Sequence, residues 1–276
     1  MRFELESPQH MLRARGLKPK ESFGQNFLAD EGVLKQMVAL AELNPGEVAI
    51  ELGAGLGHLS RHILEAGVEL WAVEKDRDMA KVLREHNWPR FHVAEENATK
   101  TVFARLTAKP EGSVLGNLPY HLSAPLLFSV LGQVSFVRCA TFTLQREVVE
   151  RLAAAPGSRD YGLLSVLLGH KFALENVLHI PAHRFFPVPK VDACVLRMRR
   201  LPSPRGFVKD EARFVRLVKA AFSRRRKTLA NALKSDMALF AQQSILQSLE
   251  MAHIDVKRRA ETLSPEEFAR LEAVLP

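Results

Sequence analysis

The chain has 276 residues, of which 47% are hydrophobic and 25% are charged. These fractions are close to globular averages and exclude a disordered chain or a fibrous repeat. Lysine and arginine total 39 against 31 aspartate and glutamate residues, which gives a formal net charge of +8. An excess of this size fits a polyanionic partner such as a nucleic acid, and equally a basic protein that has none.

Cysteine usage and hydropathy narrow the class of protein further. Cys139 and Cys194 lie in apolar runs and are expected to be small buried side chains, which excludes a disulfide scaffold and a cysteine-based zinc site. We expect no metal. No uncharged apolar stretch approaches the ~20 residues of a membrane span, and the first residues lack the apolar core of a signal peptide. We therefore expect a cytoplasmic protein without a membrane partner.

The first 30 residues are polar and basic, and Asp30 is then expected to cap a helix with apolar positions between 33 and 41. From residue 48 onward, strand and helix patterns alternate. We expect strands at 48–52, 69–74, 90–93 and 113–115, and helices at 59–65, 79–85 and 124–131. Strict alternation of this kind predicts a doubly wound, parallel α/β sheet.

The following residues are expected to complete this sheet and then leave it. We expect a strand at 139–144, helices at 147–154 and from 163, and strands at 172–179 and 193–198, the last two as an antiparallel pair. Two prolines and a glycine at 201–206 indicate a linker, and only helical patterns follow it. Ser264 and the Pro-Glu-Glu after it are typical of a helix start. We expect one domain at 1–202, with a basic N-terminal segment at 1–30, and a small helical domain at 203–276.

Glycines follow the first predicted strand at its turn into a helix, where an open α/β sheet binds ligands. Gly53, Gly55 and Gly57 have the spacing G-x-G-x-G, and Glu74 stands at the end of the second strand. Glycines allow close approach of the backbone to a ligand, and a carboxylate at that position accepts the hydroxyl groups of a ribose. The alternative is a tight turn without a ligand. With Glu51 before it, the pattern resembles motif I and the following acidic position of S-adenosylmethionine-dependent methyltransferases.

A second motif follows the fourth predicted strand and consists of Asn117, Leu118, Pro119 and Tyr120. It resembles the motif of enzymes that methylate the exocyclic N6 of adenine. An aromatic amine is a poor nucleophile, and an Asn oxygen together with a backbone carbonyl can accept its two N–H bonds and aim its lone pair at a methyl donor. Tyr120 would stack on the base, which is worth ~1–3 kcal/mol. The alternative is a proline turn between strand and helix.

Further motifs extend the resemblance along nearly the whole chain. They are F-G-Q-N-F-L at 23–28, V-E-K-D at 73–76, L-Q-R-E-V at 144–148, Y-G-L-L-S-V at 161–166, F-F-P-V-P-K-V-D at 185–192, A-F-S-R-R-R-K-T-L at 221–229 and R-A-E-T-L-S at 259–264. The chain resembles the ribosomal RNA adenine N6,N6-dimethyltransferase family, and most of all its small-subunit (KsgA-type) branch. This resemblance implies a class I methyltransferase (Rossmann-like) fold with a helical C-terminal domain. It also implies S-adenosyl-L-methionine as cofactor and dimethylation of two adjacent adenosines in the 3′-terminal hairpin of 16S ribosomal RNA during small-subunit biogenesis.

The resemblance implies roles for individual residues. Those at the cofactor are Asn26, Leu28, Gly53, Gly55, Glu74, Asn97 and Asn117, and those that hold the target adenine are Asn117, Leu118, Pro119, Tyr120 and Phe185. Phe185 would stack on the adenine opposite Tyr120, and its alternative is a core aromatic. Asn97 stands where the family has Asp; an uncharged acceptor for the adenine amino group of the cofactor predicts weaker cofactor binding. His121 stands where Asn is usual, and its role is left open.

Two basic runs are expected to contact RNA phosphates, because RNA with a splayed-out base is held through its backbone. The first comprises Arg224, Arg225, Arg226 and Lys227, and the second lies at 257–259. Basic residues between 13 and 20 are expected to form a second arm. The alternative for each run is a solvated charged face.

Two other functions stay open. A sister enzyme that dimethylates one adenosine of large-subunit ribosomal RNA and confers antibiotic resistance shares both motifs, but the strings at 23–28 and 259–264 favour the small-subunit branch. A non-catalytic RNA-binding assembly or transcription factor of the same fold would be expected to have a damaged glycine loop or Asn117 motif, and both are intact. We expect a monomer whose partner is 16S ribosomal RNA in the small ribosomal subunit.

Overall fold

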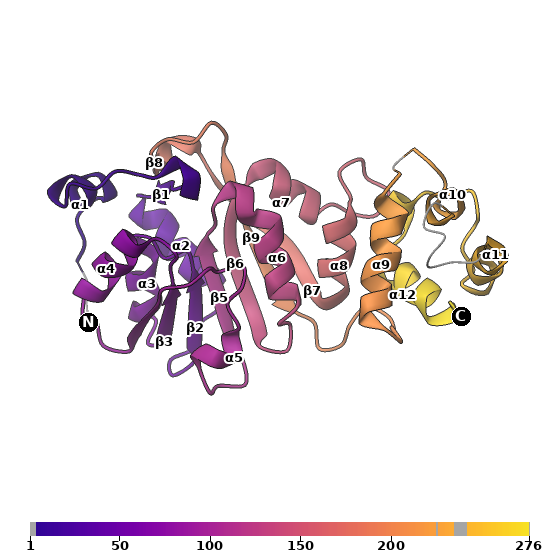
Figure 1. Cartoon of the computed structure of the whole chain (residues 1–276), viewed down its shortest axis with the longest axis horizontal. Coiled ribbons are helices and arrows are strands. Elements are labelled where there is room, and N and C mark those ends of the chain that lie inside the picture. Colours follow the sequence, from indigo (N-terminus) through magenta and orange to yellow (C-terminus); the bar gives the residue numbers. More distant parts are fainter. Residues whose placement is uncertain (1–3, 225, 235–241, 276) are drawn as a thin grey trace. The chain divides into compact units, whose positions relative to one another are not determined.

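The computed structural model describes residues 4–224, 226–234 and 242–275. Its main feature is a seven-stranded sheet with the strand order β4-β3-β2-β5-β6-β9-β7 (Figure 1). The strands are β2 (Val48–Leu52), β3 (Glu69–Val73), β4 (Phe91–Ala94), β5 (Gly112–Asn117), β6 (Val137–Gln145), β7 (Phe172–Ile180) and β9 (Ala193–Arg200). Strands β2 to β6 run parallel, whereas β9 is antiparallel to β6. The predicted α/β class with a parallel sheet closed by later strands is confirmed.

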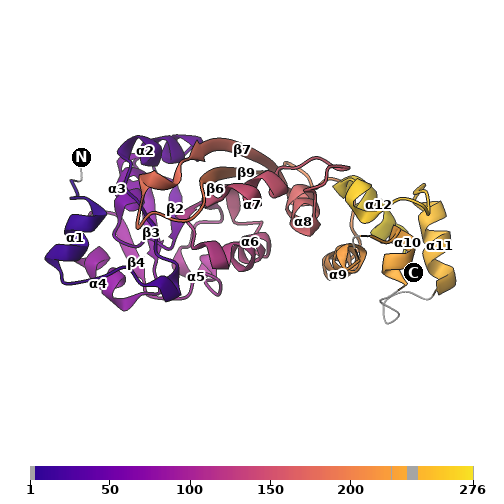
Figure 2. The same ribbon diagram turned by 90° about the horizontal axis from the view of Figure 1, so that it is seen from above.

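Helices cover both faces of this sheet. They are α2 (Glu31–Leu40), α3 (His58–Glu65), α4 (Arg77–Glu85), α5 (Phe103–Leu106), α6 (Ser123–Leu131) and α7 (Arg146–Leu152). Helices α2 and α3 lie on one face, and α5 and α6 lie on the other (Figure 2). The Asp30 carboxylate accepts a hydrogen bond from the Val33 N–H at 2.9 Å and caps α2, as predicted. All five residues of β2 are buried, which is typical of a central parallel strand.

The N-terminal segment contains structure that the sequence analysis did not predict. Helix α1 (Pro8–Ala14) begins after Ser7, whose side chain accepts from the His10 N–H, and it buries Met11 and Leu12 in an apolar cluster with Phe27. A helix this short depends on such packing for its stability. Strand β1 (Phe27–Leu28) pairs antiparallel with β8 (Phe185–Phe186), so that Leu28 lies opposite Phe185. This pairing joins residues distant in sequence, and no local pattern predicts it.

The chain divides into two compact units, which we describe separately. Unit 1 consists of Met1–Val149 and Glu175–Arg200, and unit 2 of Glu150–Leu174 and Leu201–Pro276. The residues at 150–174, which the sequence analysis assigned to the first domain, thus group with the C-terminal helices. The reason is local: the Arg205 carbonyl accepts from the His170 ring at 2.9 Å, and the Arg205 guanidinium donates to the Gly169 carbonyl at 2.7 Å.

Unit 2 is helical, as expected for the C-terminal part. Its helices are α8 (Leu163–Lys171), α9 (Glu211–Phe222), α10 (Leu229–Leu233), α11 (Gln242–Met251) and α12 (Pro265–Val274). Ser264 caps α12 in a capping box with Glu267, and Pro265 occupies its first turn, which confirms the predicted helix start. The guanidinium of Arg258 donates to both carboxylate oxygens of Glu267, at 2.5 and 3.0 Å. Part of the second basic run therefore braces the start of α12.

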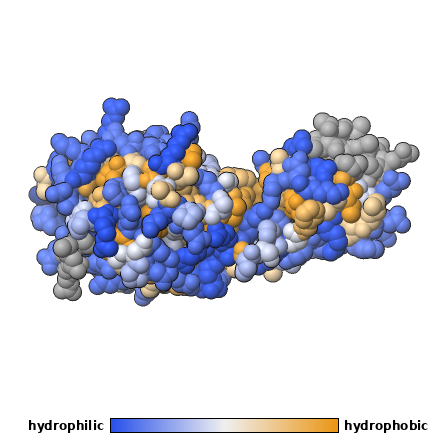
Figure 3. Space-filling model, turned by 90° about the horizontal axis from the view of Figure 1, so that it is seen from below, coloured by the Kyte–Doolittle hydropathy of each residue, from blue (hydrophilic) through white to orange (hydrophobic). Residues whose placement is uncertain are grey.

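The cysteines and the molecular surface can be compared with what the composition led us to expect. Cys139 and Cys194 form no disulfide bond and are buried, with exposed fractions of 1% and 2%. The face in Figure 3 is mainly hydrophilic, with apolar residues gathered in patches. Within the described ranges, no helix is long and apolar enough to cross a membrane. The same ranges contain no group of three or more His, Cys, Asp or Glu side chains arranged to hold a metal ion.

Candidate active site

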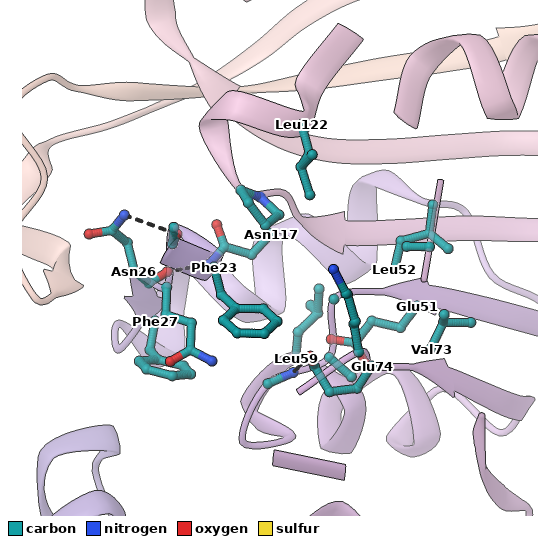
Figure 4. A pocket seen from close by; sticks show the side chains of 18 of the residues that line it. Phe23, Asn26, Phe27, Glu51, Leu52, Leu59, Val73, Glu74, Asn117 and Leu122 are labelled. Atoms are coloured by element: carbon teal, nitrogen blue, oxygen red, sulfur yellow. Dashed lines mark hydrogen bonds between the residues drawn. The ribbon is translucent and has the colours of Figure 1, made fainter. Parts of the chain in front are cut away.

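A cavity of about 360 Å³ opens in unit 1 at the carboxyl ends of β2, β3 and β5 (Figure 4). The N-terminal segment at 22–28 forms one of its sides. All residues that were predicted to bind the cofactor line this cavity: Asn26, Leu28, Gly53, Gly55, Glu74, Asn97 and Asn117. Ligands of open α/β sheets bind at this edge, so the cavity lies where the topology expects a site.

The glycine loop at 53–57 lines part of the cavity. Gly53 and Gly55 have φ angles of 74° and 57°, a backbone region that residues with a side chain seldom adopt. A Cβ atom on Gly53 would find its nearest neighbour, the Pro119 Cδ, only at 3.9 Å, whereas one on Gly55 would lie 3.0 Å from the Phe27 ring. Gly53 therefore leaves room for a ligand, and Gly55 leaves room for the N-terminal segment.

Glu74 follows β3 and is held by backbone donors. Its carboxylate accepts from the Gly55 N–H at 2.9 Å and from the Asp76 N–H at 2.8 Å, and the residue is 8% exposed. Burial raises the pKa of this carboxyl, while the backbone N–H groups of Asp76 and Gly55 oppose that rise. Each carboxylate oxygen has a second lone pair, so this rigid group can still accept two hydrogen bonds from a ligand.

Glu51 lies beside Glu74 and has a different environment. It is 1% exposed, and one of its oxygens accepts from the Ser60 hydroxyl at 2.5 Å. Burial raises the pKa of Glu51 to about 8. The hydrogen bond from Ser60 opposes this rise, and the charge of Glu74 adds to it. The pair is therefore expected to hold one charge near neutral pH, with the proton on Glu51.

A protonated Glu51 predicts a specific dependence of stability on pH. The unfolded chain releases this proton near its ordinary pKa of 4.5, and the folded protein releases it near 8. The contribution of Glu51 to the free energy of unfolding is thus fully present below about 4.5 and is lost as the pH rises through about 8. Urea unfolding of the wild type and of Glu51→Gln across this range should show the wild type losing stability relative to the variant. Parallel pH profiles of the two proteins would contradict the assignment.

Asn117 ends β5 and is oriented by the N-terminal segment. Its side-chain Nδ2 donates to the backbone carbonyl of Asn26 at 2.7 Å (Figure 4). The register places Asn117 opposite Thr143 of β6, and the next residue, Leu118, is 2% exposed and donates its N–H to the Thr143 carbonyl at 3.3 Å. With the nitrogen engaged by Asn26, the Oδ1 of Asn117 is left as the acceptor of this side chain.

Tyr120 starts the short turn of helix after Pro119 and is half-buried. Burial, with the nearby charge of Asp192, raises the pKa of its hydroxyl to about 12, so the phenol stays protonated. No partner for this buried hydroxyl occurs among the described residues. Tyr120 and Phe185 are not among the described residues that line the cavity. Phe185 is 3% exposed and packs in the core with Leu28, so its ring stacks on nothing outside the fold in this conformation.

The two departures from the family pattern, Asn97 and His121, both lie at the cavity wall. The Oδ1 of Asn97 accepts from the N–H and the hydroxyl of Thr99 at 3.1 and 2.9 Å. The group that Asn97 has left for a ligand is therefore Nδ2, a donor. His121 is exposed and lines the cavity, and a Cβ atom on Gly24 would lie 2.9 Å from its Nδ1. Gly24 is thus required by the close packing of the N-terminal segment on His121.

The first basic run lies in unit 2 between α9 and α10. Arg224, Arg226 and Lys227 are exposed, whereas Arg225 falls outside the described residues. In the expected second arm at 13–20, Lys20 is bound within the protein, because it forms ion pairs of 2.7 Å each with Asp76 and Asp78. This role of Lys20, and that of Gln25, could not be predicted from the sequence, because their partner Asp76 is distant in sequence.

Comparison with known proteins assigns this site to a family. The family model described as Ribosomal RNA adenine dimethylase matches residues 16–275. The chain belongs to this family. The rRNA adenine dimethylase family thus accounts for the glycine loop and the Asn117 motif together, and the predicted family and enzyme class are confirmed.

Similar proteins support the predicted branch of the rRNA adenine dimethylase family. The chain is 52% identical to the "Ribosomal RNA small subunit methyltransferase A" of Myxococcus xanthus, over 98% of this chain and 96% of that protein. The protein of the same name from Anaeromyxobacter sp. strain K is 46% identical, with 98% of each chain covered. These relatives confirm the resemblance to the small-subunit branch.

Solved structures confirm the fold. A dimethyladenosine transferase from Plasmodium falciparum aligns with a TM-score of 0.76 at 24% identity, over 89% of this chain and 95% of that one. The 23S rRNA methyltransferase ErmE aligns with a TM-score of 0.68 at 25% identity, over 91% and 99% of the two chains. This chain thus shares its architecture with a dimethyladenosine transferase and with a 23S rRNA methyltransferase.

Proposed function

We propose that the protein uses S-adenosyl-L-methionine to dimethylate N6 of two adjacent adenosines in the 3′-terminal hairpin of 16S ribosomal RNA, within small-subunit biogenesis. The orientation of Asn117 is the observation that carries this proposal. Its nitrogen is bound to the Asn26 carbonyl at 2.7 Å, which leaves its oxygen to accept an N–H bond of a substrate amine. The partner in this proposal is the small ribosomal subunit, and the protein acts as a monomer in the cytoplasm.

The cavity residues fit the proposed cofactor, which supplies an electrophilic methyl group when bound. Glu74 presents fixed acceptors for the hydroxyl groups of a ribose. A Cβ atom on Gly53 would project into the space that such a ligand needs, since only Pro119 lies near it, at 3.9 Å. Asn26, Leu28 and the Phe23 ring complete the cavity from the N-terminal segment.

The chain's own residues would make the adenine amine reactive by holding it in place. The Asn117 oxygen and a backbone carbonyl of the 117–120 turn accept the two N–H bonds, which favours a pyramidal nitrogen with a directed lone pair. The N–C bond would form as the bond between the methyl group and the cofactor's sulfur breaks, and the nitrogen would then be cationic and acidic enough to release its proton to water. Tyr120 and Phe185 provide stacking in this proposal, which requires the Phe185 ring to leave its core position when RNA binds.

The test is methyl transfer from labelled cofactor to small subunits that lack these methyl groups, followed by mapping of the modified bases. We expect label on two adjacent adenosines of the 3′-terminal hairpin. Label only in large-subunit RNA would favour the resistance-type activity. Cofactor binding without any transfer would favour a non-catalytic RNA-binding role. Either result would overturn the proposal.

RNA binding by the first basic run is expected to depend steeply on salt, because each phosphate contact releases bound counterions. Replacing Arg224, Arg226 and Lys227 by alanine should weaken binding and reduce the slope of log K against log salt by about 2 to 3. The exposed lysines Lys35, Lys81 and Lys109 of unit 1 provide a matched triple alanine control. A flat salt response, or equal slopes for the two triple variants, would contradict phosphate contact by this run.

Asn97→Asp is expected to strengthen cofactor binding. With one oxygen engaged by Thr99, Asn97 offers a donor to the ligand, whereas Asp would offer a second, charged acceptor for the cofactor's adenine amino group. A gain of about 1 kcal/mol corresponds to roughly fivefold tighter binding by calorimetry. Gln36→Glu adds the same charge at an exposed site outside the cavity lining and serves as control. Unchanged or weaker binding by Asn97→Asp would contradict the donor assignment.

A further inference from the structure

One buried carboxylate, that of Asp76, ties the N-terminal segment to the start of α4. Its Oδ1 accepts from the Lys20 ammonium at 2.7 Å and from the Asp78 N–H at 3.0 Å. Its Oδ2 accepts from the Gln25 side-chain Nε2 at 2.8 Å. The oxygen of that same Gln25 amide accepts from the Lys20 N–H at 2.8 Å. Lys20, Gln25 and Asp76 thus form a closed ring of hydrogen bonds, in which each residue is bonded to the other two.

The charges of this set are well matched. Asp76 is 2% exposed, and burial alone would raise its pKa, but the hydrogen bonds from Lys20 and Gln25 outweigh that effect and hold the pKa below its usual value. The same contacts to Asp76 and Asp78 raise the pKa of Lys20. Both groups therefore stay charged at neutral pH. Removing either partner would leave the other charge without compensation, which is costly for a buried carboxylate.

The set connects the two ends of the active site. On one side, the Asp76 N–H donates to Glu74 at 2.8 Å, the carboxylate placed at the ribose position. On the other side, Gln25 directly precedes Asn26, whose carbonyl accepts from the Asn117 side chain at 2.7 Å. Figure 4 shows the Asn117 side chain directed at the backbone of Asn26, whose own side chain points away from Asn117. A continuous series of contacts therefore runs from Glu74 through Asp76 and Gln25 to Asn117.

We propose that Lys20 and Gln25 are positioning residues for methyl transfer, which act by holding the Asn26 carbonyl where it fixes the orientation of the Asn117 amide. This inference rests on the proposed function of Asn117 as the acceptor for the target amine. A carboxamide has an acceptor and a donor of nearly equal size, and a half-turn about its terminal bond exchanges them. The Asn26 carbonyl favours the orientation with the nitrogen toward itself. Without this partner Asn117 can present its NH₂ group to the substrate amine, which is a donor facing a donor.

The direct test compares Gln25→Ala and Lys20→Ala with the wild type at saturating cofactor and RNA. We expect kcat to fall roughly tenfold or more, because a small misplacement of a positioning group is costly to rate. The KM for RNA should change little. The melting temperature of Lys20→Ala should fall, because the buried Asp76 carboxylate loses its cation, so kcat is measured well below the melting temperature of each variant. Lys20→Arg keeps the charge and should restore most of kcat. The matched control is Arg84→Ala. Arg84 lies on α4, and its replacement breaks the 2.9 Å ion pair with Glu95 without changing any contact of the N-terminal segment.

A reciprocal exchange separates positioning from general loss of structure. In Gln25→Glu alone, two carboxylates face each other, and in Asp76→Asn alone, two amide groups meet with one donor unsatisfied. The double variant keeps the total charge and restores the set, since an Asn at 76 can donate to a Glu at 25, whose other oxygen accepts from the Lys20 N–H. We expect kcat of the double variant to exceed that of either single variant. Absence of this recovery, or a fall in melting temperature with kcat unchanged, would overturn the inference.

Asn117→Ala and cofactor calorimetry make the two possible failures distinguishable. If Asn117→Ala keeps full turnover, the proposed function of Asn117 is wrong. If Asn117→Ala loses turnover while Gln25→Ala and Lys20→Ala retain it, the proposed function stands and the positioning role is wrong. Cofactor binding that is lost in Gln25→Ala even at the highest concentrations would assign the segment to cofactor retention and would also overturn the positioning role.

Discussion

Asn117→Ala is expected to lower kcat by on the order of 100-fold while the affinity for RNA stays near that of the wild type. The side chain offers one preorganised acceptor to the amine, and removal of a single preorganised polar group from an active site typically costs about 100- to 1,000-fold in rate. RNA affinity depends instead on phosphate contacts elsewhere in the chain. Single-turnover methylation and equilibrium RNA binding measure the two quantities separately.

The control for this experiment is an asparagine outside the cavity lining. Asn44 lies in the turn before β2, and its side-chain Nδ2 donates to the Glu47 carboxylate at 2.7 Å, so Asn44→Ala tests the loss of an ordinary carboxamide. We expect normal turnover of its folded form. Parallel loss of turnover and of RNA affinity in Asn117→Ala would mean that Asn117 acts as a structural residue of the turn.

Substitution of Glu74 is expected to have the second large effect, on the affinity for S-adenosylmethionine. Glu74→Ala removes both acceptors for the ribose hydroxyl groups and the partner of the Gly55 N–H. Hydrogen bonds to a charged group are worth about 1.5–3 kcal/mol each, so calorimetry should show cofactor binding weaker by at least roughly 10-fold. Glu74→Gln should also weaken binding, since its single oxygen cannot serve both the Gly55 and the Asp76 N–H groups.

Glu69→Gln is the matched control, because Glu69 begins the same strand at its amino end and pairs with His92 at the surface. Its cofactor affinity should equal that of the wild type. Melting temperatures of the three variants report any loss of structure. Wild-type affinity in Glu74→Ala would refute the ribose-binding role, and an RNA affinity that falls as much as cofactor affinity would indicate general damage to the fold.

Local features of the sequence were sufficient for most of the catalytic unit. Strand β2 was predicted at the residues where it occurs, because a run of apolar residues bounded by turns has few other solutions in an α/β chain. The caps at Asp30 and Ser264 could also be predicted, because each cap involves residues only three positions apart. The glycine loop and the Asn117 motif are likewise contiguous, and their place after buried strands put them at one edge of the sheet.

Helix α1 and strand β8 were missed for different reasons. Ser7 and Pro8 carried a usable signal for a helix start, but only two buried apolar residues followed in a basic segment, and packing on Phe27 supplies the rest of the stabilisation. The pairing of β1 with β8 brings Leu28 opposite Phe185 across most of the chain. No local pattern encodes such a pair. The stacking role of Phe185 stays a prediction for this reason.

The sequence by itself determined the fold class, the family and the residues around the cavity, because these follow from periodicity and from contiguous motifs. Only the tertiary structure decided how those residues are oriented. It binds the Asn117 nitrogen to Asn26 and so leaves the Asn117 oxygen as the acceptor, it turns the Asn97 oxygen toward Thr99, and it pairs the Lys20 ammonium with Asp76. Hydrogen-bond direction depends on partners that the chain brings together only after folding, whereas the presence of a donor or acceptor is already written in the residue type.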